Sequence, residues 1–102
     1  MEDNCNDLIV IYSIINNYLV ERILVDDGST VEVLIFDAFK KMGLDESLLR
    51  PVEPIYDFSN QPIKVKGSIT LLVTLDQVEN TVTEQAKFLV VDQPSAYNAI
   101  IS

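Results

Sequence analysis

The residues best suited to chemistry in this sequence are four consecutive ones, Asp26-Asp27-Gly28-Ser29, which directly follow the apolar run 23–25. An Asp-Gly pair between two apolar runs is also a strong signal for an ordinary hairpin turn. Composition and periodicity alone favour that simpler interpretation. In the functional interpretation, a buried strand delivers the Asp26 carboxylate into a turn. Gly28 then lets a backbone or a substrate approach closely, and the Ser29 hydroxyl hydrogen-bonds the outer carboxylate oxygen.

One carboxylate is insufficient for peptide hydrolysis, because activating a water molecule and protonating the leaving amine require a base and an acid together. A two-fold homodimer supplies both by bringing Asp26 of each chain to the symmetry axis. Two carboxyl groups so close together cannot both ionise easily, so they share one proton. The ionised member would activate the water while the protonated member polarises the scissile carbonyl. A single chain would be inert.

The composition excludes most other catalytic chemistry. The sequence has no histidine and a single cysteine, Cys5. Ser-His-Asp and Cys-His nucleophilic catalysis and imidazole acid–base chemistry are therefore impossible within one chain. An intrachain disulfide and a thiolate metal cage are excluded as well. We expect no metal and no cofactor, and the lone thiol favours a reducing, intracellular location, which we expect to be the cytoplasm.

The charge argues against nucleic acid and membranes as partners. The 102 residues include 16 acidic and 7 basic side chains, which gives a formal net charge of −9. Phosphate binding needs clustered Lys and Arg, whereas the cations here are scattered, and an anionic membrane surface would repel the chain. No apolar run reaches the roughly 18 residues of a membrane span. The apolar run 8–15 follows acidic residues, unlike a signal peptide.

The elements that must position the Asp26 turn are mainly strands. Strands of β-branched and aromatic residues are expected at 8–15 and 18–25, joined by a tight turn at Asn16-Asn17. A polar stretch at 59–62 between two alternating arms predicts a second hairpin with one wet face. Further strands are expected at 31–35, 68–75, 81–83, 88–91 and 99–101. The sum is a mainly β domain of about seven or eight short strands.

One or two short helices complete the expected set of elements. Asp37 is expected to cap a helix that ends at Gly43, with Lys40 and Lys41 near its C-terminal end. Asp45 is expected to cap one more helical turn before Pro51.

The chain resembles the aspartic protease segment of gypsy-type long-terminal-repeat retrotransposon polyproteins, common in plants, and hence the retropepsin-like family. The resemblance runs from about Leu8 to Ile101 and rests on four blocks in the family's order. These blocks are Leu24-Val25-Asp26-Asp27-Gly28-Ser29-Thr30, Asp37-Ala38-Phe39-Lys40-Lys41-Met42-Gly43-Leu44, Gly67-Ser68-Ile69-Thr70-Leu71, and Phe88-Leu89-Val90-Val91-Asp92 with Ser95-Ala96-Tyr97-Asn98-Ala99-Ile100-Ile101.

The resemblance implies a retropepsin-like closed β-barrel, equivalent to half of pepsin, with a flap hairpin over the substrate. It assigns catalysis to Asp26 and support of the active-site turn to Asp27, Gly28 and Ser29. The flap and substrate contacts would come from Tyr56, Asp57, Phe58, Ser59, Asn60 and Gln61. The implied protein is a homodimeric aspartic endopeptidase domain that cleaves a Gag-Pol-type polyprotein.

Three departures from the family pattern affect these expectations. Asp27 stands where the family often has Thr, and near a dimer axis its charge would weaken the dimer. Asp57 stands where glycine is usual at the base of the flap. After Ile100-Ile101 the family continues with Gly-Arg-Pro, a helix and a strand, whereas this chain has Ser102. We therefore expect a domain at 8–102 that is C-terminally truncated relative to the family. Residues 1–7 are expected to be frayed.

Loss of that C-terminal segment is expected to leave an open sheet edge and an exposed apolar patch. Two alternatives to the protease therefore stay open at this point. One is an inactive or domesticated protease-like β domain that acts as a peptide-binding or interaction module. The other is an unrelated acidic, β-rich interaction module.

Overall fold

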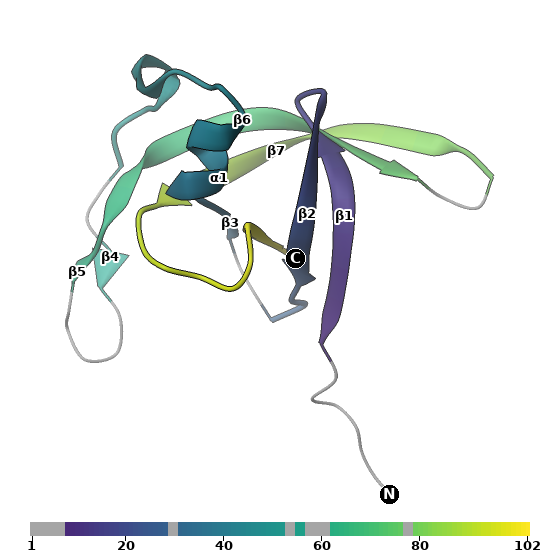
Figure 1. Cartoon of the computed structure of the whole chain (residues 1–102), viewed down its shortest axis with the longest axis horizontal. Coiled ribbons are helices and arrows are strands. Elements are labelled where there is room, and N and C mark those ends of the chain that lie inside the picture. Colours follow the sequence, from purple (N-terminus) through teal and green to yellow (C-terminus); the bar gives the residue numbers. More distant parts are fainter. Residues whose placement is uncertain (1–7, 29–30, 53–54, 57–61, 77–78) are drawn as a thin grey trace, which may run out of the picture.

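Six strands of the chain close into a barrel, and two short ones form a separate hairpin (Figure 1). A computed structural model describes residues 8–28, 31–52, 55–56, 62–76 and 79–102. The strands are β1 (Ile9–Ile15), β2 (Tyr18–Val25), β3 (Glu32–Ile35), β4 (Ile55–Tyr56), β5 (Pro62–Ile63), β6 (Val65–Asp76), β7 (Thr81–Val91) and β8 (Ala99–Ile101). The helices are α1 (Phe36–Lys41) and the 3-10 turn η1 (Glu46–Leu48). The order around the barrel is β1-β2-β8-β3-β7-β6, which confirms the expected mainly β closed barrel.

The β1–β2 hairpin forms where the sequence predicts it. Asn16 and Asn17 have φ angles of 54° and 66°, the left-handed conformation that a two-residue hairpin turn requires at both positions. Asparagine tolerates this conformation better than most residues. The turn fixes the pairing of Ile15 with Tyr18 and so the register of the whole hairpin.

Helix α1 starts two residues earlier than the sequence predicts, since its N-cap is Ile35 and not Asp37. Its N-cap residue is Ile35, which makes no side-chain capping bond, and Asp37 lies inside the first turn. The expectation that Asp37 caps the helix is therefore wrong, because burial of the Phe36 ring against the core places that residue in the helix. The expected stop at Gly43 is confirmed by its φ of 76°.

The expected helical turn after Asp45 is also present, as η1. Hydrogen bonds from the backbone N–H and side chain of Ser47 hold the pKa of the Asp45 carboxyl below its usual value, with the backbone bond the larger cause. This carboxylate therefore caps η1 most strongly when ionised, and the bond weakens as the pH falls through that lowered pKa.

Strands β6 and β7 form one long antiparallel hairpin. Ile69, Leu71 and Val73 of β6 are buried on one face, as their alternation predicts. The sequence suggested two separate strands at 81–83 and 88–91, but β7 runs without interruption from Thr81 to Val91. The polar residues between the two apolar runs stay in the strand because each is paired with a residue of β6.

Strand β8 closes the barrel between two neighbours. It pairs in parallel with β2 and antiparallel with β3. Strand β8 is therefore bonded on both sides.

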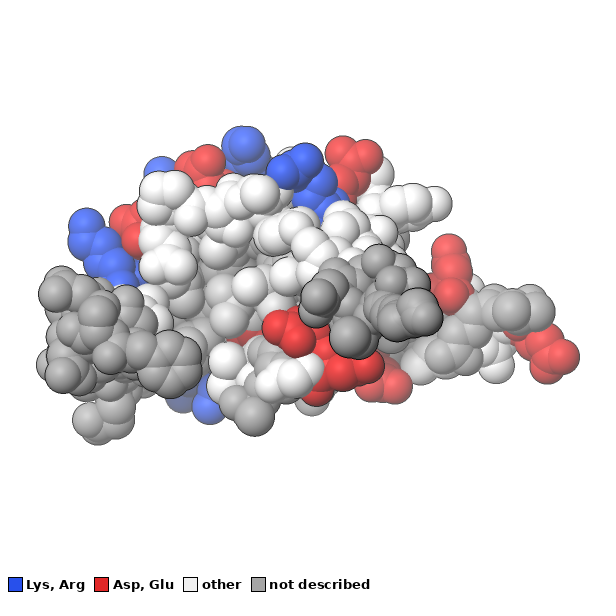
Figure 2. Space-filling view, turned by 90° about the horizontal axis from the view of Figure 1, so that it is seen from below, with Lys and Arg blue, Asp and Glu red and all other residues white. Residues whose placement is uncertain are grey.

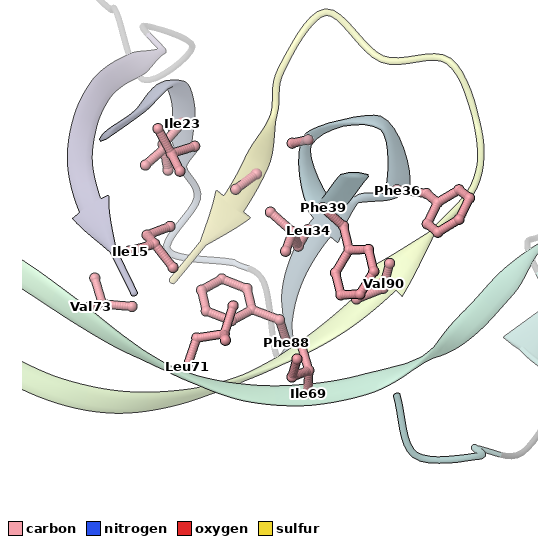
Figure 3. Packing of buried hydrophobic residues seen from close by; sticks show 13 residues of the cluster. Ile15, Ile23, Leu34, Phe36, Phe39, Ile69, Leu71, Val73, Phe88 and Val90 are labelled. Atoms are coloured by element: carbon pink, nitrogen blue, oxygen red, sulfur yellow. The ribbon is translucent and has the colours of Figure 1, made fainter. Parts of the chain in front are cut away.

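The core fills the inside of the barrel. Ile15, Ile23, Leu34, Phe88 and Val90 are fully buried, and each such side chain contributes about 1.5–3 kcal/mol by leaving water. Helix α1 adds two aromatic rings, Phe36 and Phe39, whose centroids lie 5.9 Å apart (Figure 3). This core supports β2 and β8 from within, up to the point where β2 ends at the Asp26 turn.

The base of the expected flap hairpin is present. β4 pairs antiparallel with β5, through Ile55 with Ile63 and Tyr56 with Pro62. Asp57, Phe58, Ser59, Asn60 and Gln61, which the resemblance assigns to a flap, lie outside the described residues, as do residues 1–7, which were expected to be frayed. No helix in the described part of the chain is long and apolar enough to span a membrane.

Candidate active site

Asp26 is the first residue after β2, and two hydrogen bonds hold it. Its N–H donates to the carbonyl oxygen of Ile101 at 2.7 Å. Its carboxylate oxygen Oδ1 accepts the N–H of Gly28 at 3.0 Å. The residue is exposed to solvent. Asp26 is thus fixed at both its backbone and its side chain, while its carboxylate remains accessible to water or to another molecule.

Gly28 and Asp27 complete the described part of this turn, and both are exposed. A Cβ atom at Gly28 would meet Oδ1 of Asp26 at 3.4 Å, an ordinary contact distance. Within the described residues, the chain itself therefore leaves the space beside Gly28 open, as approach of a partner or substrate would require. Ser29, the expected supporting hydroxyl, lies outside the described residues.

The Asp26 turn directly follows β2, which is paired with a strand on each side. Val25, the last residue of β2, pairs with Ile9 of β1 on one side and with Ile101 of β8 on the other. Asp26 therefore emerges from the middle of three strands, and its backbone has little freedom to move. The end of β2 and the β4–β5 hairpin lie along the same lower side of the view in Figure 1.

Apolar side chains are exposed at the end of the barrel that carries Asp26. Leu8, Ile9 and Val10 are 65%, 59% and 49% exposed, and Ile9 is the neighbour of Val25. Figure 2 shows the molecule from below, with acidic side chains gathered near the middle of that face and most Lys and Arg side chains toward its upper and left margins. This end of the molecule therefore combines negative charge with an apolar strip.

A second set of bonds near β8 was not expected from the sequence. Asn98, which directly precedes β8, donates its backbone N–H to Arg22 O at 2.9 Å and its side-chain amide to Glu21 O at 2.7 Å. An Asn directly before an apolar strand was the available signal. The acceptors lie in a distant part of the sequence, so the bonds themselves could not be foreseen.

No group of three or more His, Cys, Asp or Glu residues that could hold a metal ion occurs in the described ranges. The chemistry available in the described site is that of a carboxylate.

No model of a known protein family matches the chain, and no curated protein matches it. Several solved structures, however, match the chain. A retropepsin-like aspartic protease from Rickettsia conorii aligns with a TM-score of 0.67 and 21% identity, over 96% of this chain and 69% of the other. EIAV protease in complex with the inhibitor HBY-793 aligns with a TM-score of 0.61 and 16% identity, over 99% of this chain and 86% of the other. The chain therefore has the retropepsin-like fold that the sequence predicts.

Proposed function

We propose that this chain is an aspartic endopeptidase domain that is active only as a homodimer, with Asp26 of each copy forming the catalytic pair. The observation that carries the proposal is the placement of Asp26. Its carboxylate is exposed directly after β2, a strand of which only Val20 and Ile23 are buried. The Gly28 N–H fixes that carboxylate, within a fold shared with two proteases.

In the proposed reaction the two Asp26 carboxyl groups hold one proton between them. The ionised group removes a proton from a water molecule, whose oxygen attacks the scissile carbonyl carbon. The protonated group donates its proton to the carbonyl oxygen. Collapse of this tetrahedral intermediate breaks the C–N bond, and the leaving amine takes a proton from the pair while one hydroxyl of the intermediate returns a proton to it. No metal and no cofactor enters this scheme.

The apolar strip beside the turn supports the homodimer. Leu8, Ile9 and Val10 expose large side chains at the end of the barrel that carries Asp26. A two-fold partner placed there would remove these side chains from water, and burial of apolar surface is the main driving force for association. The same contact would bring the two Asp26 residues together.

The proposed substrate is an extended polypeptide. It would lie between the hairpin based on β4 and β5 and the Asp26 pair, with its main chain hydrogen-bonded like an added strand. The four sequence blocks that resemble gypsy-type retrotransposon proteases point to an intracellular retroelement polyprotein as its source.

Asp27 favours a second candidate function, that of a peptide-binding domain without hydrolytic activity. It is exposed next to Asp26, so a dimer would gather four carboxylates in one small volume. Repulsion among them opposes the association that catalysis requires.

The test is cleavage of an unstructured protein at a pH between about 4 and 6, where a carboxyl pair holds one proton. The proposal predicts that the rate rises with the square of chain concentration while dimers are scarce. It also predicts that Asp26→Asn abolishes cleavage, while Asp37→Asn, an exposed carboxylate on α1, does not.

Cleavage that survives in Asp26→Asn would refute the assignment of the catalytic residue. A folded wild-type chain that binds extended peptides and cleaves none would instead favour the second candidate.

A further inference from the structure

Strand β8 has only three residues, Ala99–Ile101, yet it supplies the carbonyl that accepts the Asp26 N–H. Its register with β2 decides which carbonyl lies opposite that N–H. Burial of Ala99 and pairing with β2 and β3 specify part of this register. Because the strand is so short, bonds made by the residue next to it add a large share of the remaining restraint.

Asn98, which directly precedes β8, is bonded to both neighbouring strands. On the β2 side its N–H donates to Arg22 O at 2.9 Å and its side-chain amide to Glu21 O at 2.7 Å. On the β3 side its carbonyl accepts the N–H of Ile35 at 2.9 Å. One residue thus fixes the start of β8 against β2 and β3 together.

A bulge in β2 makes this arrangement possible. Glu21 and Arg22 together lie opposite the single residue Tyr12 of β1, and Arg22 has a φ of 60°. A left-handed backbone is unfavourable for a residue other than glycine and persists only where the surroundings enforce it. Bulges redirect the groups of a strand, and here the two successive carbonyls meet the same residue, Asn98. The Arg22 guanidinium also donates to Ala96 O in the loop before β8.

We propose that Asn98 is a positioning residue for Asp26. It holds β8 in the one register that places Ile101 O at the Asp26 N–H, and so fixes where the carboxylate stands. The connection is short, because the parallel ladder runs from the Asn98–Arg22 bond at one end to the Asp26–Ile101 bond at the other. The catalytic part of this inference rests on the proposed function of Asp26.

Amide hydrogen exchange tests the register role without any assay of activity. In Asn98→Asp a carboxylate of the same size faces Glu21 O and donates nothing. Loss of one such hydrogen bond should speed exchange of the Asp26 amide about tenfold. Amides in the middle of the β6–β7 hairpin, such as Leu71, should exchange as in wild type.

Two further variants complete this experiment. Asn98→Ala removes the donor without adding charge, and it gives the same readout if Asn98→Asp fails to fold. Asn80→Asp makes the same chemical change at an exposed residue in the turn between β6 and β7. It should leave exchange of the Asp26 amide unchanged.

Steady-state kinetics test the catalytic part. The Asn98 variants that fold should lose kcat about tenfold with little change in KM, because substrate contacts stay while the reacting group is misplaced. A change confined to KM would contradict the positioning role.

The outcomes separate this inference from the proposed function. Unchanged exchange of the Asp26 amide in both Asn98 variants would overturn the inference, whether or not the wild-type chain is a protease. Faster exchange with unaltered kcat would overturn it too, because the register of β8 would then have no effect on the position of the Asp26 carboxylate. Faster exchange in a chain that cleaves nothing would support the register role and refute the proposed function.

Discussion

At the residue scale, Asp26 combines exposure with restraint. The Gly28 N–H holds Oδ1, and the Ile101 carbonyl holds the backbone N–H. A carboxylate that is already oriented has less freedom to lose when a substrate arrives, which lowers the entropic cost of reaching a reactive geometry. The neighbouring Asp27 has no comparable role in the described structure, and in a dimer it adds only charge.

Replacing Asp27 should therefore strengthen the proposed homodimer. Asp27→Thr removes one negative charge per chain beside the proposed axis, so the homodimer should form with a dissociation constant about tenfold lower. Sedimentation equilibrium at neutral pH and low salt measures this constant. Glu84→Gln, at an exposed position on β7, removes an equal charge elsewhere and is the matched control. Equal effects of the two substitutions would contradict a place for Asp27 near the axis.

The location of Asp26 could be predicted from the sequence, and the bonds that hold it only in part. An apolar run that ends in Asp-Asp-Gly predicts a strand followed by a turn, and the bond from the Gly28 N–H is local to that turn. The bond to Ile101 joins residues that are far apart in the sequence, through parallel pairing of β2 with β8. Periodicity within a segment carries no information on which distant strand becomes its neighbour.

At the element scale, the segment after η1 crosses β6 at Gly67. Arg50 and Ser68 exchange two backbone hydrogen bonds of 2.9 Å each. A Cβ atom at Gly67 would lie 2.7 Å from Arg50 O, and the residue has a φ of 146°. Only glycine satisfies both conditions, and the register of β6 with β7 shifts at this point. The crossing anchors the chain just before the β4–β5 hairpin.

The structure predicts that Gly67→Ala destabilises the chain by about 2–4 kcal/mol, because it adds a clash with backbone to an unfavourable φ. Gly43→Ala is the control: it also has a positive φ, but nothing lies within 4 Å of the added atom. That substitution should cost about 1–2 kcal/mol. Urea unfolding of both variants measures the difference. A Gly67→Ala chain as stable as Gly43→Ala would show that the crossing is not tightly packed.

The elements themselves were predictable wherever the signal is local. The Asn16-Asn17 turn and the stop at Gly43 depend on backbone preferences of single residues, and both were confirmed. The start of α1 and the continuity of β7 depend on tertiary contacts instead. Burial of Phe36 extends the helix past Asp37, and pairing with β6 carries β7 through its polar middle. At those two points the local sequence favours a helix capped by Asp37 and a break within β7, and the structure has neither.

At the scale of the whole molecule, charge and apolar surface oppose each other. The chain carries a formal net charge of −9, and two copies repel at neutral pH. The exposed strip of Leu8, Ile9 and Val10 favours association. The balance between these two effects should decide how much of the proposed dimer is present.

Salt and acid should therefore both promote dimerisation. Raising the ionic strength from 0.01 M to 1 M shortens the screening length from about 30 Å to about 3 Å, so the dissociation constant at neutral pH should fall. Lowering the pH toward the isoelectric point near 4.1 should act in the same direction by neutralising carboxylates. Ile9→Asp should abolish dimerisation under all these conditions. Dissociation at higher salt would indicate an interface held by ion pairs, contrary to this account.

The central claim, that one active site takes Asp26 from two chains, is tested most directly by mixing. Wild type and Asp26→Asn are combined at a fixed total concentration at which all chains are dimeric, and they are allowed to exchange partners before cleavage is measured. If both carboxyl groups are needed, activity follows the square of the wild-type fraction, and an equal mixture retains about one quarter of the wild-type rate. An equal mixture that retains about one half would mean that each chain acts with its own Asp26 alone, and the account would be wrong.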